Sequence, residues 1–150
     1  MIGRSSMFGK SGAVSSFETE TVWNSGLEGT GEAAGHSLAV GRDAEWLPEH
    51  LLLLAAEACF MSTLLALAAA EGIDVMGYVS SGHLRVPADR DAVALISLEP
   101  CAIVTSTLDA DRLSKLGVRA QQESVTARLL GSRLQVTMDV QTIPAEVPVQ

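Results

Sequence analysis

The chain has 150 residues, of which 47% are hydrophobic and 19% are charged, so its length fits one domain with its own core. A net charge of −8 argues against binding to the phosphate backbones of nucleic acids. The two cysteines, Cys59 and Cys101, form no disulfide framework, and residues 1–16 lack the apolar stretch of a secretory signal. We therefore expect a cytoplasmic protein that does not bind nucleic acid.

The N-terminal third predicts a poorly ordered segment followed by two strands. Residues 1–16 are rich in Ser and Gly and are expected to be poorly ordered. Residues 17–24 alternate apolar and polar side chains, as a half-buried strand does. Four glycines punctuate residues 25–35, which predicts turns, and residues 36–40 form a second strand that pairs back on the first.

The clearest element is a long helix that begins at Pro48. Proline suits the first helical position, and the negative charge of Glu49 suits the first turn. Residues 51–70 are almost entirely Leu, Ala, Met, Phe and Cys, and Gly72 supplies a stop. A helix over residues 48–71 would be about 36 Å long at 1.5 Å per residue.

A helix that is apolar on all sides is either buried on every side or lies in a membrane. Residues 51–70 are long enough to span a bilayer, but Glu57 interrupts them and neither flank carries a basic cluster. We therefore expect no membrane span. One chain with a modest sheet can hardly cover such a helix, so we expect a homodimer that packs the long helices together. The alternative is a monomer whose sheet wraps the helix.

The remaining sequence predicts two strands, a helix, a short helix and a final strand. Asp109 or Asp111 can cap the second helix, which carries Leu113, Leu116 and Ala120 on one face. In chain order the expected elements are strands 73–86 and 92–107, helical turns over 124–130, and a strand over 133–141. The whole predicts an α+β fold with a largely antiparallel sheet and a long central buried helix. We expect one domain over residues 17–141 and a C-terminal tail over residues 142–150.

The segment LPEHLLLLAAEACF, residues 47–60, resembles the signature of the OsmC/Ohr family. In that signature a Pro-Glu pair enters a long helix, and small residues then precede a Cys-Phe pair. The resemblance implies an OsmC-like intertwined homodimer with active sites at the subunit interface, which reduces organic hydroperoxides in oxidative-stress defence. It also implies that Cys59 is the peroxidatic cysteine and that Glu49 holds an arginine against its thiol.

The supporting residues of this site are harder to assign. Glu49 and Cys59 are ten residues apart, about 15 Å along one helix, so a joint site needs a bent helix start, a bridging residue or a partner subunit. Free cysteine has a pKa near 8.5, and a thiolate in mid-helix needs a nearby cation. Arg42 is the one Lys or Arg between residues 17 and 49. It is the candidate cation; a solvated loop arginine is the alternative.

The second cysteine of the family belongs to a Cys-Pro-x-Ser segment after the second helix. Glu123 or Ser124 takes that position here, and neither can form a disulfide. Cys101 is the only other thiol, either a resolving cysteine or a small buried residue. Without a second thiol, the sulfenic acid formed on Cys59 needs an external thiol reductant.

Two functions follow. One is a thiol-dependent hydroperoxide reductase with Cys59 as its single peroxidatic cysteine, in which Glu57 could face the pocket, pair with an arginine or face solvent. The other is a non-catalytic dimer that binds a small hydrophobic ligand at the subunit interface. The three histidines are widely scattered and no glycine-rich loop opens a helix, so we expect no metal and no cofactor.

Overall fold

The computed structural model describes residues 15–144. Residues 15–19 have no regular secondary structure, and the rest of the predicted poorly ordered segment lies outside the described residues, as does most of the predicted tail. The chain divides between Leu47 and Pro48 into two compact units.

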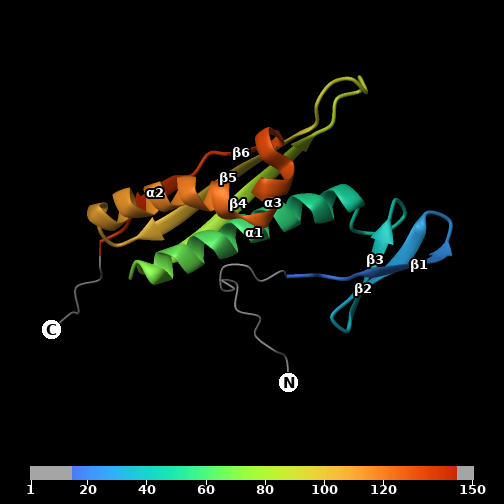
Figure 1. Ribbon diagram of the computed structural model, residues 1–150, viewed down its shortest axis with the longest axis horizontal. Helices are drawn as coiled ribbons and strands as arrows, with labels where there is room; N and C mark the ends of the chain where they lie inside the picture. The colour runs from blue at the N-terminus through green and yellow to red at the C-terminus, as the bar shows by residue number, and fades with distance from the viewer. Residues whose placement is uncertain (1–14, 145–150) are drawn as a thin grey trace. The chain divides into compact units, whose positions relative to one another are not determined.

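The first unit is a three-stranded antiparallel meander (Figure 1). Its strands are β1 (Glu20–Ser25), β2 (Glu28–Ala33) and β3 (His36–Gly41), in the order β1-β2-β3. Our prediction of turns throughout residues 25–35 was wrong, because β2 occupies most of that segment. Its glycines allow close strand approach: a Cβ at Gly29 would lie 2.7 Å from the carbonyl oxygen of Val22.

The meander buries little of its own apolar surface. All six residues of β1 are exposed, so the predicted half-buried strand is not half-buried within this chain. Trp23 is 73% exposed, and its Nε1 donates a hydrogen bond to the carbonyl of Gly26. The segment after β3 is tied back to the turn between β1 and β2, because the amide of Arg42 donates to the carbonyl of Leu27 and a carboxylate oxygen of Asp43 accepts from the amide of Leu27.

The second unit packs helices on one sheet (Figure 1). Helix α1 (Pro48–Ala70) has the predicted start and ends one residue before the predicted end. Strands β4 (Gly77–Arg85) and β5 (Leu95–Val104) form a long antiparallel hairpin. The other elements are α2 (Thr107–Glu123), α3 (Val125–Leu130), a 3₁₀ turn η1 (Gly131–Arg133), β6 (Leu134–Val136) and β7 (Asp139–Thr142).

Two details of this unit differ from the sequence-based expectation. The expected final strand is split into β6 and β7, and both pair with β5 in parallel, so the sheet is mixed rather than antiparallel throughout. The cap of α2 is Ser106, whose hydroxyl accepts a hydrogen bond from the amide of Asp109. Asp109 therefore lies in the first turn, where its charge suits the helix dipole.

The core lies between the helices and one face of the sheet. On β5 the side chains of Ile96, Leu98, Ala102 and Val104 lie on the buried face, which Pro100 shares, while the alternate residues from Ser97 to Ile103 are more exposed. They meet Phe60 and Leu64 from α1 and Leu113, Leu116 and Ala120 from α2. The predicted apolar face of α2 is therefore confirmed.

Helix α1 buries only part of its circumference in this chain. Its buried side chains are Ala56, Phe60, Thr63, Leu64, Leu67 and Ala68. Leu52 and Leu54 are each 46% exposed, so the helix is not buried on every side within one subunit. By length and composition it could also cross a membrane, since its mean hydropathy is 2.1 over the most apolar window. A third of the residues in that window are buried in the described structure.

Candidate thiol site at Cys59

Cys59 lies in the middle of α1 and is half-buried. Its neighbours one turn away along the helix are small: Ala55 and Ala56 on one side, Ser62 and Thr63 on the other. The hydroxyl of Thr63 donates to the carbonyl of Cys59, at 2.8 Å, and that of Ser62 donates to the carbonyl of Ala58. These hydroxyls are therefore satisfied by the helix itself.

The helix provides no cation for a Cys59 thiolate. It contains no Lys or Arg, its carboxylates, Glu49 and Glu57, are acidic, and its one histidine, His50, is nine residues, about 13.5 Å, from Cys59 along the helix. Cys59 is also about three turns from the helix N-terminus, beyond the reach of the dipole. Positive charge must therefore come from outside α1 if the thiol is to ionise readily at neutral pH.

Glu49 and Arg42 belong to different units of the chain. Glu49 lies in the first turn of α1, and one of its carboxylate oxygens is buried. The helix is continuous from Pro48 to Ala70, so no bent start brings Glu49 to Cys59. Arg42 is exposed and follows β3. Its pairing with the thiol stays a prediction.

Glu57 does not share the side of the helix that carries Cys59. Two residues of an α-helix correspond to a rotation of about 200°. The carboxyl group of Glu57 instead lies against β4, because a Cβ built on Gly82 would come within 2.9 Å of its Cδ. The structure therefore does not bring this secondary candidate to the thiol.

Cys101 is also separated from Cys59. Gly82 faces α1 and pairs with Leu98 across the hairpin, so Leu98 points to the helix side of the sheet. Cys101, three residues further along β5, points to the opposite side. The sheet lies between the two thiols, and a disulfide needs Cα atoms within about 7 Å of each other. Cys101 is thus placed as a sheet residue rather than as a resolving cysteine of the same chain.

The environment of Cys101 also opposes ionisation. Its sulfur lies 3.9 Å from a carboxylate oxygen of Asp139 on β7. Burial, the negative charge of Asp139 and the contact with that carboxylate together raise the pKa of the Cys101 thiol. Cys101 should therefore be a slow nucleophile at neutral pH.

We predict that Asp139→Asn accelerates alkylation of Cys101 at pH 8. The substitution removes a negative charge, so the pKa of Cys101 falls and its thiolate fraction at that pH rises. The measurement is the rate of iodoacetamide labelling in a Cys59→Ser background. An unchanged rate would show that Asp139 does not control this thiol.

Glu123 and Ser124 have structural roles. Glu123 ends α2, and its carboxylate accepts from Nε of Arg119 at 2.6 Å. Ser124 is 1% exposed; its hydroxyl caps α3 by accepting from the amide of Ala127. Neither residue supplies a thiol, and Ser124 already has a hydrogen-bond partner.

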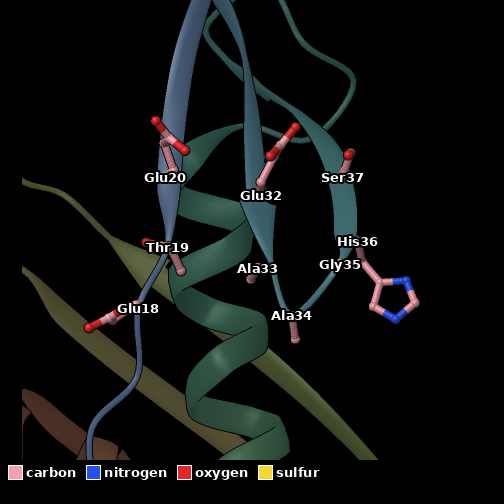
Figure 2. A pocket seen from close by; sticks show the side chains of 9 residues that line it. All are labelled: Glu18, Thr19, Glu20, Glu32, Ala33, Ala34, Gly35, His36 and Ser37. Carbon is pink, nitrogen blue, oxygen red and sulfur yellow. The ribbon is translucent and has the colours of Figure 1, made fainter. Parts of the chain in front are cut away.

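Cys59 does not line either of the two hollows considered next. One, of about 430 Å³, lies on the first unit, where the carboxylates of Glu20 and Glu32 stand on paired strands and His36 points away (Figure 2). The other, of about 340 Å³, adjoins the end of α1 and is lined by Leu65, Ala69, Ile73 and Val75 among others. Among residues 15–144 no group of three His, Cys, Asp or Glu side chains is placed to hold a metal ion.

The fold is shared with a set of solved structures. An OsmC-like protein of unknown function from Vibrio cholerae superposes with a TM-score of 0.71 at 15% identity, over 83% of this chain and 99% of that one. An OsmC-like protein from Mycoplasma pneumoniae gives 0.70 at 13%, over 86% and 99%. An organic hydroperoxide resistance protein OsmC from Legionella pneumophila gives 0.62 at 17%, over 87% and 99%.

The chain therefore has the OsmC-like α+β fold, and the resemblance seen around Cys59 is confirmed at the level of the fold. No family model matches the sequence. No curated protein matches it either. Because the identities are low, the likeness establishes the architecture, and the chemistry of the site is argued from this chain's own residues.

Proposed function

We propose that this protein reduces organic hydroperoxides in oxidative-stress defence, with Cys59 as a single peroxidatic cysteine and an external thiol as reductant. The observation that carries the proposal is a half-buried cysteine in the middle of the long helix of an OsmC-like fold. Two structures of this fold are described as organic hydroperoxide resistance proteins, from Legionella pneumophila and Elizabethkingia anophelis.

The reaction has two stages. The Cys59 thiolate attacks the terminal oxygen of the hydroperoxide; the S–O bond forms, the O–O bond breaks, and the alkoxide leaves and takes a proton to become the alcohol. Cys59 is then a sulfenic acid. An external thiol attacks its sulfur and expels water, and a second thiol cleaves the mixed disulfide and restores Cys59. External resolution is favoured because Cys101 lies across the sheet and Ser124 has no sulfur.

The test is consumption of an organic hydroperoxide in the presence of a small dithiol or monothiol. The protein should accelerate consumption well above the rate of the thiol alone, with the alcohol as product. A rate that matches the protein-free control with both kinds of reductant would refute the proposal. We place this chemistry in the cytoplasm, where thiol reductants are maintained.

Arg42 is the cation that we propose for the site. An opposite charge within about 4–6 Å lowers the pKa of an acidic group by about 1–3, so its loss should slow the reaction at pH 7 about tenfold or more. We expect Arg42→Ala to show this loss and Arg42→Lys, which keeps the charge, to retain most of the rate. Measurement of both rates between pH 6 and 9 checks the prediction. Equal rates for Arg42→Ala and wild type across that range would remove Arg42 from the site.

We further propose a homodimer, because one subunit leaves apolar surface of α1 and of the β1–β3 meander uncovered. Leu52 and Leu54 are half-exposed on α1, and Val22, Trp23 and Leu38 are exposed on the meander. A second copy of the chain would bury these side chains, and uncovered apolar patches of this kind mark interaction sites.

The predicted mass in solution is therefore twice the 15.7 kDa of one chain. Leu54→Lys should shift the particle toward the single-chain mass, because a charge would be buried among apolar side chains. Leu129→Lys, at a position that is 80% exposed on α3, is the matched control and should remain dimeric. Light scattering over a range of concentrations measures both, and a wild-type monomer at all of them would contradict the dimer.

A second candidate function is a non-catalytic dimer that holds a small hydrophobic ligand at its interface. It is favoured by one observation, the lack of a thiol at positions 123 and 124. Native mass spectrometry of the purified protein would detect a bound lipid-like molecule. A ligand-free protein that consumes hydroperoxide would decide against this candidate.

A further inference from the structure

A row of polar groups lies between α1 and β4, away from Cys59. Tyr78 and Ser80 are alternate residues of β4 that pair with Ala102 and Pro100. Their partners on β5 are fully buried, so both side chains point to the helix-covered face of the sheet. Glu57 of α1 reaches the same face at Gly82, two residues further along β4.

The two hydroxyl groups are buried without a hydrogen-bond partner. Tyr78 Oη and Ser80 Oγ are both inaccessible to solvent, and neither has a partner of acceptable geometry among the described residues. Burial raises the pKa of Tyr78 to about 12; the nearby Ser80 hydroxyl opposes that rise, and the negative charge of Glu57 adds to it. The three groups are therefore close enough to influence one another.

Glu57 has no ion-pair partner in this part of the molecule. Within residues 15–144, Arg112 pairs with Glu71 and Asp109, and Arg119 pairs with Glu123. Glu57 takes part in none of the ion pairs of these residues. A carboxylate within an apolar helix needs hydrogen-bond donors, and buried hydroxyl groups are almost always paired with protein or with ordered water. Tyr78 Oη and Ser80 Oγ are thus buried and unpaired at a seam whose edge is formed by the partly exposed Glu57.

The chemistry of these three groups restricts which kind of molecule can bind between them. Two hydroxyls donate and accept hydrogen bonds, and the carboxylate only accepts. An anion would be repelled by Glu57, and a cation would lose its hydration in an apolar surrounding. A neutral molecule that accepts from hydroxyls and donates to a carboxylate fits all three, and buried water typically makes about three such bonds.

We propose that the seam between α1 and β4 is a structural water site, in which Tyr78, Ser80 and Glu57 hold one or two ordered water molecules. The bound water connects the Glu57 side of α1 to β4. Because Cys59 is about 200° around the helix from Glu57, the same connection fixes which side of α1 presents the thiol. Tyr78, Ser80 and Glu57 are positioning residues in this account, and the water site does not depend on the hydroperoxide chemistry.

The thermal test depends on the sign of a stability change. Removal of an unpaired buried hydroxyl relieves a cost and raises the melting temperature, whereas removal of a hydroxyl that holds water lowers it. We expect Tyr78→Phe to lower Tm by about 2–4 °C in the full-length protein. The loss should shrink in a Ser80→Ala background, where the same water is already weakened. Ser81→Ala, on the exposed face of the same strand, is the matched control and should leave Tm unchanged.

A crystal structure at high resolution gives the direct test. Ordered water within about 3.2 Å of Tyr78 Oη, Ser80 Oγ and the Glu57 carboxylate, lost or displaced in Tyr78→Phe, is the expected result. A seam without ordered water, or a side chain of a second copy in this position, would overturn the proposal. A Tm for Tyr78→Phe equal to or above that of the wild type would also overturn it.

Discussion

Replacement of Cys59 by Ser is expected to reduce hydroperoxide consumption at least about 100-fold, to the rate of the reductant alone. Serine has nearly the same size but does not form a nucleophilic anion at neutral pH, so the variant keeps the fold and loses the reaction. Thr63 donates to the backbone carbonyl at position 59, a bond that the substitution leaves intact. The measurement is the initial rate with saturating dithiol.

The matched variant for this experiment is Cys101→Ser. Cys101 lies on the far side of the sheet, and its thiol has a raised pKa beside Asp139, so its loss should change the rate less than about twofold. Equal losses in both variants would show that Cys101 takes part, and equal activity of wild type and Cys59→Ser would end the enzyme proposal.

Phe60→Ala is expected to destabilise the protein by about 3–5 kcal/mol, the largest stability effect among the single substitutions considered. Phe60 is fully buried where α1 meets the core, and truncation leaves a cavity that the surrounding helices and sheet cannot fill completely. Domains are typically stable by about 5–15 kcal/mol, so this loss is a large share of the total. Urea denaturation followed by circular dichroism measures it.

Leu129→Ala is the control for that experiment. Leu129 is 80% exposed on α3, and exposed substitutions usually change stability by less than about 0.5 kcal/mol. A loss at Phe60 that is no larger than the loss at Leu129 would contradict the packing described here.

Strong local signals explain which parts of the fold were predictable. Helix α1 was predicted to within one residue because Pro48 begins it and the Gly72 turn follows it, with an unbroken apolar run between. Strand β2 was missed because Gly29 and Gly31 are typical of turns, although here they permit close strand approach. The parallel pairing of β6 and β7 with β5 was not predictable, since alternation shows that a strand has two faces but not which strand it pairs with.

The candidate site was predictable only where a motif carried it. Cys59 stood out through the motif around it, and its place in mid-helix is confirmed. The position of Cys101 across the sheet depends on strand register, which the sequence does not specify. The row formed by Tyr78 and Ser80 was missed because two polar residues in a strand look solvent-exposed; the one signal was Glu57, an acidic residue in an otherwise apolar stretch.

The central claim is that Cys59 is the sulfur that accepts oxygen from a hydroperoxide and that no second thiol of the chain resolves it. Tandem mass spectrometry of protein treated with one equivalent of an organic hydroperoxide, without reductant and with a sulfenic-acid trap, tests this claim most directly. We expect the trap on the peptide that contains Cys59 and a free thiol at Cys101. A Cys59–Cys101 disulfide within one chain, or oxidation at Cys101 with Cys59 intact, would contradict it.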